Sequence, residues 1–426
     1  MEVILLTDVL PTDDENSIGF GHETRTRSRY FLSNEMKIMT AMYTLRRGGA
    51  YDRFIMMLEA FLERECTVHC LSLTPIEIEH PCYRNHVLIL PFKIGNGFAT
   101  KLTVLLFFPL YSLLVGWREK IDIFIAFGTL YAFIESIPKW ILRKPLVTFI
   151  RGSFAFGMQT QGRSKFLLWV NRWIEKIGIL FSDTILSVNS TIQEEMRKSV
   201  RVKKNVRWEV LPNNIPPMPI PKSQDISQIR KKYGIPRDAK ILVTAGVINR
   251  GKNIDLLIRS LPEIGLDNLF LLIIGDGTTE ADLKYQTDLK KLVNDLKLSD
   301  RVVFKGWVGK EELWEIFRYS DLFSLPSKSE GMPNAMLEAL GLDLPCLGSR
   351  ISGVKDILQH EELMFDPKDE KDIVRKISRF FSDEQLSNHI AELCRGRKKD
   401  FFFDWKEKVF QMATKITFDR GEGSQG

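Results

Sequence analysis

The sequence predicts two consecutive doubly wound α/β domains, on three observations. Short apolar runs such as IDIFIAF, LVTFI and LFLLIIG, which suit a parallel sheet buried on both faces, alternate with stretches of helical spacing. At 426 residues the chain has room for about two or three domains. A proline-rich, polar segment at 210–224, VLPNNIPPMPIPKSQ, interrupts the pattern, which restarts after it; this composition predicts an exposed linker.

The composition excludes several classes of protein. The hydrophobic share of 44% and charged share of 27% indicate a globular chain rather than a disordered one. The net charge of +6 comes from 60 basic and 54 acidic residues, an excess too small to favour nucleic-acid binding. The five cysteines include no Cys-x-x-Cys pair, which argues against a disulfide framework and for reduced thiols in the cytoplasm.

The first domain is predicted over residues 35–215, after an N-terminal extension at 1–34. The extension lacks the basic start of a secretory signal, so a cytoplasmic location is expected. KIMTAMY, the glycine turn RRGG, the helical pattern RFIMMLEAFLER and the apolar run TVHCLSL then form a strand, turn, helix and strand. This is a βαβ unit.

Two apolar stretches of the first domain have two interpretations. The stretch at 102–117 is shorter than the ~20 residues of a spanning helix and contains Pro109, so it is not expected to cross a membrane. Together with SKFLLWVNRWIEKIGILF at 164–181, it is either a core helix or a helix lying on an anionic bilayer, on the inner face of the membrane.

The second domain is predicted over residues 216–404. Strand and helix patterns alternate from KILVTAG and NIDLLIRSL through LFLLIIG and DLKKLVNDLKL to DLFSLPS and AMLEALG. A final helix at 405–420 is expected to cross back to the first domain. Ligands of such sheets bind at the carboxyl ends of the strands, so the cleft between the domains is the expected site.

The most informative stretch is SEGMPNAMLEALG, which follows the buried strand DLFSLPS. Pro333 suits the first position of a helix, and the free N–H groups of a helix start attract anions. A carboxylate beside a phosphate is repelled, so Glu338 is better suited to the two hydroxyls of a ribose.

This stretch resembles the Glu-(seven residues)-Glu motif of retaining, nucleotide-sugar-dependent glycosyltransferases with the GT-B fold, the glycosyl group 1 transferases (family 4-like). The downstream GSRISGVKDIL resembles the family's Gly-Gly-x-x-Glu-Ile segment, with Ser352 and Asp356 where the family has glycine and glutamate. The resemblance covers about 37–416. It implies two Rossmann-like domains, with the acceptor on the first and the nucleotide sugar on the second.

The resemblance also implies site residues. Glu330 would contact the donor sugar and Lys252 the diphosphate; Val247 occupies the family's arginine position, and Arg250 is the candidate to replace it. Cations there would stabilise the departing diphosphate. Arg151 stands where the family has histidine. The predicted donor-binding set is Gly48, Gly49, Arg151, Gly246, Gly275, Gly277, Val308, Gly331, Met332, Pro333, Asn334 and Glu338.

The predicted function is transfer of a sugar, with retention, from a nucleotide-diphosphate sugar to a glycan or a lipid-linked acceptor. No Asp-x-Asp triplet occurs and the histidines show no ligand spacing, so neither a metal nor another cofactor is expected. The expected partners are the nucleotide sugar, the acceptor and an anionic membrane surface, without nucleic acid. The alternatives are a catalytically idle GT-B scaffold or binding subunit and a GT-B sugar epimerase.

Overall fold

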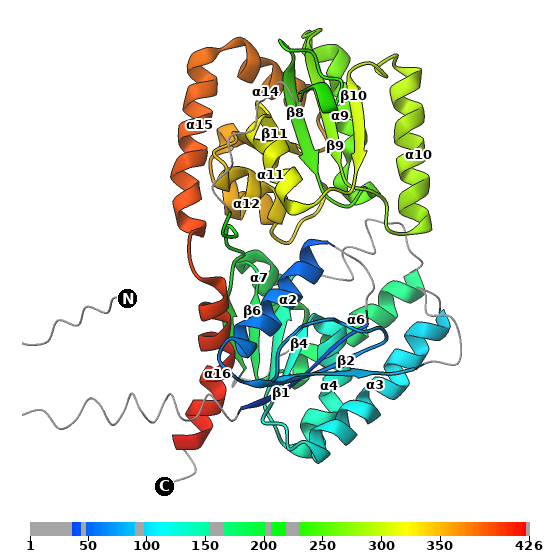
Figure 1. Cartoon of the computed structure of the whole chain (residues 1–426), viewed down its shortest axis with the longest axis vertical. Helices are drawn as coiled ribbons and strands as arrows, with labels where there is room; N and C mark the ends of the chain where they lie inside the picture. The colour runs from blue at the N-terminus through cyan, green and yellow to red at the C-terminus, as the bar shows by residue number, and fades with distance from the viewer. Residues whose placement is uncertain are drawn as a thin grey trace, which may run out of the picture.

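The computed structural model describes residues 36–43, 48–89, 98–152, 165–200, 206–218 and 230–422. Two α/β domains lie one above the other in Figure 1, and each is built on a parallel sheet with helices on both faces. The predicted fold class, two doubly wound Rossmann-like domains facing across a cleft, is confirmed.

The first domain contains a seven-stranded parallel sheet of order β3-β2-β1-β4-β5-β6-β7. β4 and β5, read as IFIAF and LVTFI, are buried along their whole length, as a sheet covered on both faces requires. β3, a half-exposed edge strand of sequence YRNHV, was not predicted from the sequence. The strands are β1 (Lys37–Met42), β2 (Thr67–Ser72), β3 (Tyr83–Val87), β4 (Ile123–Phe127), β5 (Leu146–Ile150), β6 (Thr184–Ser187) and β7 (Arg207–Val210).

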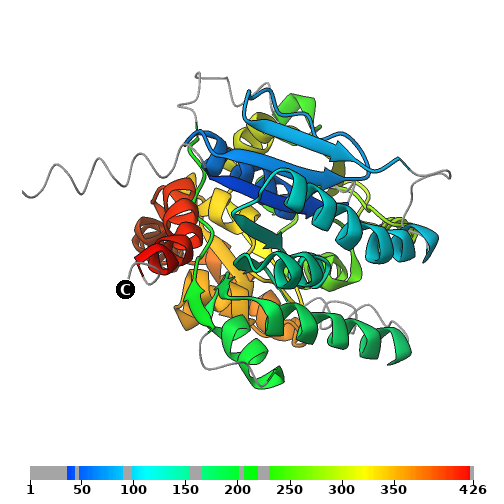
Figure 2. The same cartoon turned by 90° about the horizontal axis from the view of Figure 1, so that it is seen from below.

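The helices of this domain divide between the two faces of its sheet. Right-handed crossovers on either side of β1 place α3, α4 and α6 side by side on one face, whereas α2 and α16 pack together on the other (Figures 1 and 2). The helices are α2 (Gly49–Leu62), α3 (Phe98–Arg118), α4 (Thr129–Leu142), α6 (Lys165–Phe181), α7 (Ser190–Ser199) and the C-terminal α16 (Trp405–Glu422).

The second domain contains a six-stranded parallel sheet of order β10-β9-β8-β11-β12-β13. Its chain order changes direction between β8 and β11, which makes the carboxyl ends of these strands the expected ligand position. The strands are β8 (Lys240–Ala245), β9 (Leu269–Ile274), β10 (Val302–Gly306), β11 (Leu322–Leu325), β12 (Cys346–Ser349) and β13 (Met364–Phe365).

Helices cover both faces of the second sheet, and α15 leads back toward the first domain (Figure 1). They are α9 (Ile254–Ile264), α10 (Glu280–Asp295), α11 (Lys310–Arg318), α12 (Asn334–Gly341), α13 (Ser352–Leu358), α14 (Glu370–Ser382) and α15 (Glu384–Lys398), with short 3₁₀ turns η1 (Arg250–Lys252), η2 (Glu361–Leu363) and η3 (Lys399–Phe401).

The connection between the domains is buried where it was expected to be exposed. Asn213, Asn214 and Ile215 are all buried, so the expectation of a solvated linker is wrong for this part of the chain. The physical reason is that both asparagine side chains are hydrogen-bonded to distant elements. After α15, the chain returns to the first domain, where Trp405 of α16 is buried and donates from Nε1 to the Pro212 carbonyl at 3.1 Å.

Candidate active site between the two domains

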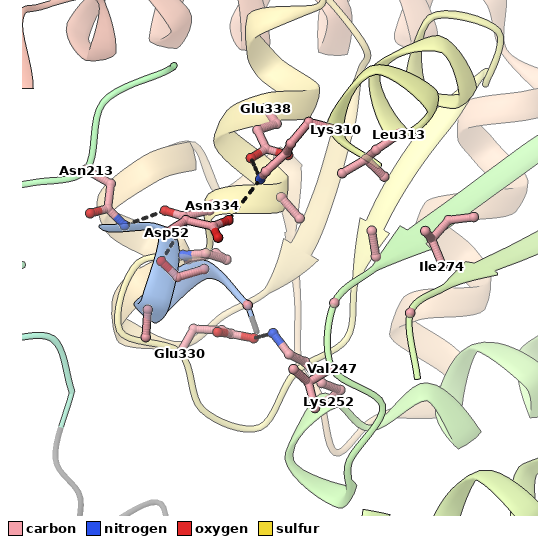
Figure 3. Close-up of a pocket in the computed structure, with 18 of the residues that line it drawn as sticks. Asp52, Asn213, Val247, Lys252, Ile274, Lys310, Leu313, Glu330, Asn334 and Glu338 are labelled. Atoms are coloured by element: carbon pink, nitrogen blue, oxygen red, sulfur yellow. Dashed lines mark hydrogen bonds and ion pairs between the residues drawn. The ribbon is translucent and has the colours of Figure 1, made fainter. Parts of the chain in front are cut away.

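A pocket of about 610 Å³ lies between the two domains (Figure 3). This volume is within the range of small-molecule sites. Its walls combine the start of α2 from the first domain with the loops after β8, β9 and β11 and the start of α12 from the second. The site therefore depends on both domains.

Most of the residues predicted from the sequence meet in this pocket, although their binding roles remain predictions. The lining includes Gly48, Gly49, Arg151, Gly246, Lys252, Gly275, Val308, Glu330, Gly331, Met332, Pro333, Asn334 and Glu338. Trp307, next to Val308, also lines it.

Lys252 and Glu330 form an ion pair at the pocket wall. Lys252 Nζ lies 2.6 Å from Glu330 Oε1, which also accepts a hydrogen bond from Ser327 Oγ at 2.6 Å. Asn249 caps the turn η1 that ends at Lys252, and the Lys328 N–H donates to the Gly251 carbonyl, so the two loops are held together. The result is a fixed cation beside a fixed carboxylate.

Glu338 of α12 is buried, yet one of its oxygens faces no donor. Lys310 Nζ lies 2.5 Å from Oε1, whereas Oε2 has no hydrogen-bond partner among the described residues. A buried carboxylate oxygen without a hydrogen-bond donor destabilises the folded protein. This site therefore favours a ligand that donates a hydrogen bond to that oxygen. Lys310 also reaches Asp52 Oδ2 of α2 at 3.5 Å and thereby connects the two domains (Figure 3).

Two glycines are needed in the pocket wall, Gly331 because a neighbouring group comes very close to its backbone and Gly246 because of its backbone conformation. A Cβ at Gly331 would lie 2.0 Å from the Arg151 carbonyl oxygen, so a side chain there would force the domains apart. Gly246 has a φ of +142° and faces Lys252 Nζ, which would be 3.5 Å from a Cβ at that position. Both glycines thus preserve the shape of the pocket.

Arg151 brings positive charge to the first domain's side of the pocket. It is half-buried, it donates to Asn213 Oδ1, and it has no carboxylate partner among the described residues. Burial and then the charge of nearby Arg53 lower the pKa of Arg151 to about 9, so it stays cationic at neutral pH. A guanidinium without a matching anion favours an anionic ligand.

Two predicted residues lie outside the lining. Arg250 is exposed, donates to Asp288 Oδ2 at 3.1 Å and lies over the Tyr285 ring, away from the pocket. Gly277 packs against the start of α10, where a Cβ would lie 2.7 Å from the Leu283 nitrogen. Both residues therefore make their contacts with α10 and not with the pocket.

Four further residues shape the site and carry no recognisable motif in the sequence. Asp52, Asn213 and Lys310 line the pocket. Arg53, just behind them, is buried and donates to Asn214 Oδ1 at 2.5 Å, to the Asn214 carbonyl at 2.7 Å and to Asn334 Oδ1 at 3.4 Å. No local pattern marks these residues, because their partners are distant in sequence.

Among the described residues, no group of three or more histidine, cysteine, aspartate or glutamate side chains is arranged to hold a metal ion. The expectation that no metal is needed stays a prediction.

Comparison with known proteins finds one family over part of the chain and similar folds over nearly all of it. Residues 225–397 match the family model described as glycosyl transferases group 1. The chain is 26% identical over 247 residues to N-acetyl-alpha-D-glucosaminyl L-malate synthase of Bacillus anthracis, covering 57% of this chain and 61% of that protein. It is 25% identical over 295 residues to the UDP-Gal:alpha-D-GlcNAc-diphosphoundecaprenol alpha-1,3-galactosyltransferase of Escherichia coli, covering 68% and 73%.

The match to the first of these relatives thus spans less than two thirds of its length. Among solved structures, Anabaena HepE in complex with UDP and glucose superposes with a TM-score of 0.71 at 17% identity, covering 91% of this chain and 99% of that one. At this identity the likeness shows the fold alone, which is the GT-B fold.

Proposed function

Because this chain belongs to the glycosyl transferases group 1 through residues 225–397, we propose that it transfers a sugar from a nucleotide-diphosphate sugar to a glycan or a lipid-linked acceptor. The observation that supports this most is Glu338, which lines the pocket together with Lys252 and Glu330 and has one buried oxygen without a donor among the described residues. A ribose hydroxyl supplies the missing donor.

The donor is proposed to lie across the second domain's side of the pocket. Its diphosphate is placed against Lys252 and the start of α12, where free N–H groups favour an anion, and its sugar against Glu330. Arg151 offers a further cation for a phosphate group. These charges would stabilise the diphosphate as it departs.

Retention of configuration, independence from metal and membrane association belong to the same proposal. The protein's part is to position the acceptor on the same face of the sugar as the leaving diphosphate and to exclude water between the domains. A lipid-linked acceptor agrees with the Escherichia coli relative, whose name specifies a diphosphoundecaprenol-linked substrate. We place the enzyme in the cytoplasm, on the inner face of a membrane.

The test is thermal shift and turnover of the purified protein with a panel of nucleotide-diphosphate sugars, in the presence of EDTA. One donor is expected to raise the melting temperature and to be hydrolysed or transferred, with the product anomer identified by NMR. If no nucleotide sugar shifts the melting temperature, the proposed donor site is refuted. If turnover stops in EDTA and returns with a divalent cation, metal independence is refuted.

A Glu330→Gln variant tests the assignment of the sugar contact. It is expected to lose turnover and to bind the nucleotide sugar more weakly, yet to bind the bare nucleoside diphosphate at least as tightly, because Lys252 is released from its ion pair. Glu362→Gln, an exposed glutamate of the same domain, is the matched control. Equal losses for the nucleotide with and without sugar would contradict the assignment.

A further inference from the structure

The outer surface of α3, α4 and α6 exposes an unusual number of large apolar side chains. Thirteen of the eighteen large hydrophobic residues that are exposed among the described residues lie on these three helices. The second domain exposes Leu283, Trp307 and Phe402, which are far apart in sequence. Contiguous apolar surface of this kind marks an interaction site. We call the exposed side of α3, α4 and α6 the apolar face.

On α3 the exposed residues form one stripe along the helix. Leu102, Leu106, Leu110 and Leu114 recur every four residues, and Trp117 extends the stripe to the last turn. This spacing places them on a single side of the helix.

The opposite side of α3 belongs to the domain core. Val104, Phe108 and Val115 are buried, and Ser112 donates to buried Glu135 of α4 at 2.5 Å. One described segment, Ala99–Arg118, is long and apolar enough to cross a membrane by length and composition. Because one side of this helix packs against the domain core, its exposed stripe is the side that is available to a surface.

On α6 the exposed stripe is aromatic. Phe166 stacks on Trp169, with ring centroids 6.2 Å apart, and Trp169 meets Trp173 edge to face at 6.0 Å. Trp140 of α4 lies on the helix between α3 and α6 and is also exposed. Tryptophans combine an apolar body with a polar N–H and are enriched where proteins meet the headgroup region of a bilayer.

The charges of the three helices have one sign at the surface. Their two acidic residues, Glu135 and Glu175, are both buried. The exposed charges are all cations, namely Lys101, Arg118, Lys165, Arg172 and Lys176. The exposed charge carried by the three helices is therefore positive, although Arg118 pairs with Glu119 just beyond α3, and this charge complements anionic lipid headgroups.

We infer that the apolar face docks on an anionic lipid bilayer, with α3, α4 and α6 lying in the interface and their lysines and arginines among the headgroups. A second copy of the chain fits less well, because a two-fold contact would bring the same cations together. The apolar face supplies two signals, apolar area and basic charge, and binding of interfacial helices to an anionic bilayer increases with both.

The orientation of the helices connects the apolar face with the pocket. In a parallel α/β domain the helices begin at the carboxyl edge of the sheet, the edge that carries Gly128 and Arg151 and faces the second domain (Figure 1). Phe166 and Leu102, near the starts of α6 and α3, are thus on the side of the first domain nearest the pocket. Resting on the proposed function, this arrangement specifies an acceptor whose lipid part stays in the bilayer while its head enters the cleft.

The experiment is co-sedimentation of the full chain with vesicles of phosphatidylcholine alone or of equal parts phosphatidylcholine and phosphatidylglycerol. Strong binding is expected with the anionic vesicles, decreasing as salt rises. Trp169→Ser/Trp173→Ser and Leu106→Ser/Leu110→Ser should each weaken binding by about tenfold or more, because each removes two large apolar side chains from the membrane. Leu283→Ser/Phe402→Ser, equally exposed but elsewhere, is the control and should bind as the wild type does.

A pair of charge-reversal variants tests the contribution of basic charge to vesicle binding. Arg172→Glu/Lys176→Glu should abolish the preference for anionic vesicles, whereas Lys284→Glu/Lys291→Glu on α10 should not. Absence of vesicle binding, or equal losses in the control variants, would overturn the inference. The inference would also be overturned if the wild type formed dimers, the serine variants were monomers and neither bound vesicles. The apolar face would then join two copies of the chain.

Vesicle binding and donor binding are read separately. The thermal shift with nucleotide sugar should be the same in all the surface variants, which also shows that they fold. Vesicle binding without any donor binding would leave the docking surface intact and refute the proposed activity. Donor turnover without vesicle binding would refute the docking surface and leave the proposed activity intact.

Discussion

At the scale of single residues, the pocket places two glutamates of the same sequence motif, Glu330 and Glu338, in different environments. Glu330 is neutralised by Lys252 and held by Ser327, whereas Glu338 is buried with one oxygen undonated. Their environments therefore suit different parts of a nucleotide sugar.

Glu338→Gln is expected to weaken binding of the bare nucleoside diphosphate and of the nucleotide sugar by the same factor, about tenfold, because the ribose is common to both. Isothermal titration of both ligands measures this. Lys310→Met serves as a comparison, because it removes the charge partner of Glu338 but leaves both carboxylate oxygens for the ribose. A Glu338→Gln effect confined to the nucleotide sugar would place Glu338 at the sugar instead.

Glu135, between α3 and α4, should make stability depend on pH. Burial raises its pKa from 4.5 to about 8, with the hydrogen bond from Ser112 opposing the shift. The folded state then holds a proton that the unfolded state has lost, so this contribution to stability is complete below pH 4.5 and declines as the pH rises toward 8.

Urea unfolding of the wild type and of Glu135→Gln at several pH values checks this. The free energy of unfolding of the wild type should fall relative to that of the variant between pH 4.5 and 8. Glu195→Gln, an exposed glutamate of α7, should follow the wild type. Parallel curves for the wild type and Glu135→Gln would mean that the carboxyl does not ionise in this window.

At the scale of elements, the order of strands and helices was largely predictable because it depends on local patterns. Strands such as β9, buried on both faces, carry an unbroken apolar run. β3 was missed because an edge strand can be polar, and YRNHV has no such run. The connection at 211–215 was misjudged because its composition is that of a loop, while its burial depends on Arg53, 161 residues away from Asn214.

The return of α16 to the first domain rests mainly on Trp405. Its ring is buried, its Nε1 donates to Pro212, and Arg53 lies over it at 5.3 Å. Trp405→Ala should lower the free energy of unfolding by about 3–5 kcal/mol, as for other large buried aromatics. Denaturant unfolding measures the loss, and exposed Phe402→Ala should cost far less. Similar costs for the two would show that α16 is not anchored by its tryptophan.

At the scale of the whole molecule, the contacts that join the two domains include a buried network around Arg53 and a half-exposed ion pair between Lys310 and Asp52. The motif residues of the pocket were predictable because each motif is a short, local stretch of sequence. Arg53, Asn213 and Lys310 were not, because their contacts exist only once the domains meet; Arg53 and Asn334 are 281 positions apart. Local sequence thus predicts which residues line the pocket better than it predicts the contacts that hold the domains together.

The buried network and the ion pair should contribute differently to the free energy of unfolding. Arg53→Met leaves the acceptors of Asn214 without their donor, which costs about 1–3 kcal/mol for each unsatisfied group. Asp52→Asn removes a half-exposed pair with Lys310 and should cost less than about 1 kcal/mol. Thermal unfolding ranks the two, and small-angle scattering should show a larger radius of gyration for Arg53→Met only. A greater loss for Asp52→Asn would reverse this assignment.

The apolar face of α3, α4 and α6 also has a kinetic consequence. A protein docked through these helices meets its acceptor in a plane, so the encounter rate follows the acceptor's mole fraction in the membrane rather than its bulk concentration. Adding plain anionic lipid at constant total acceptor would then slow turnover, although no reactant has been removed. The amount of membrane would become a variable that sets the rate.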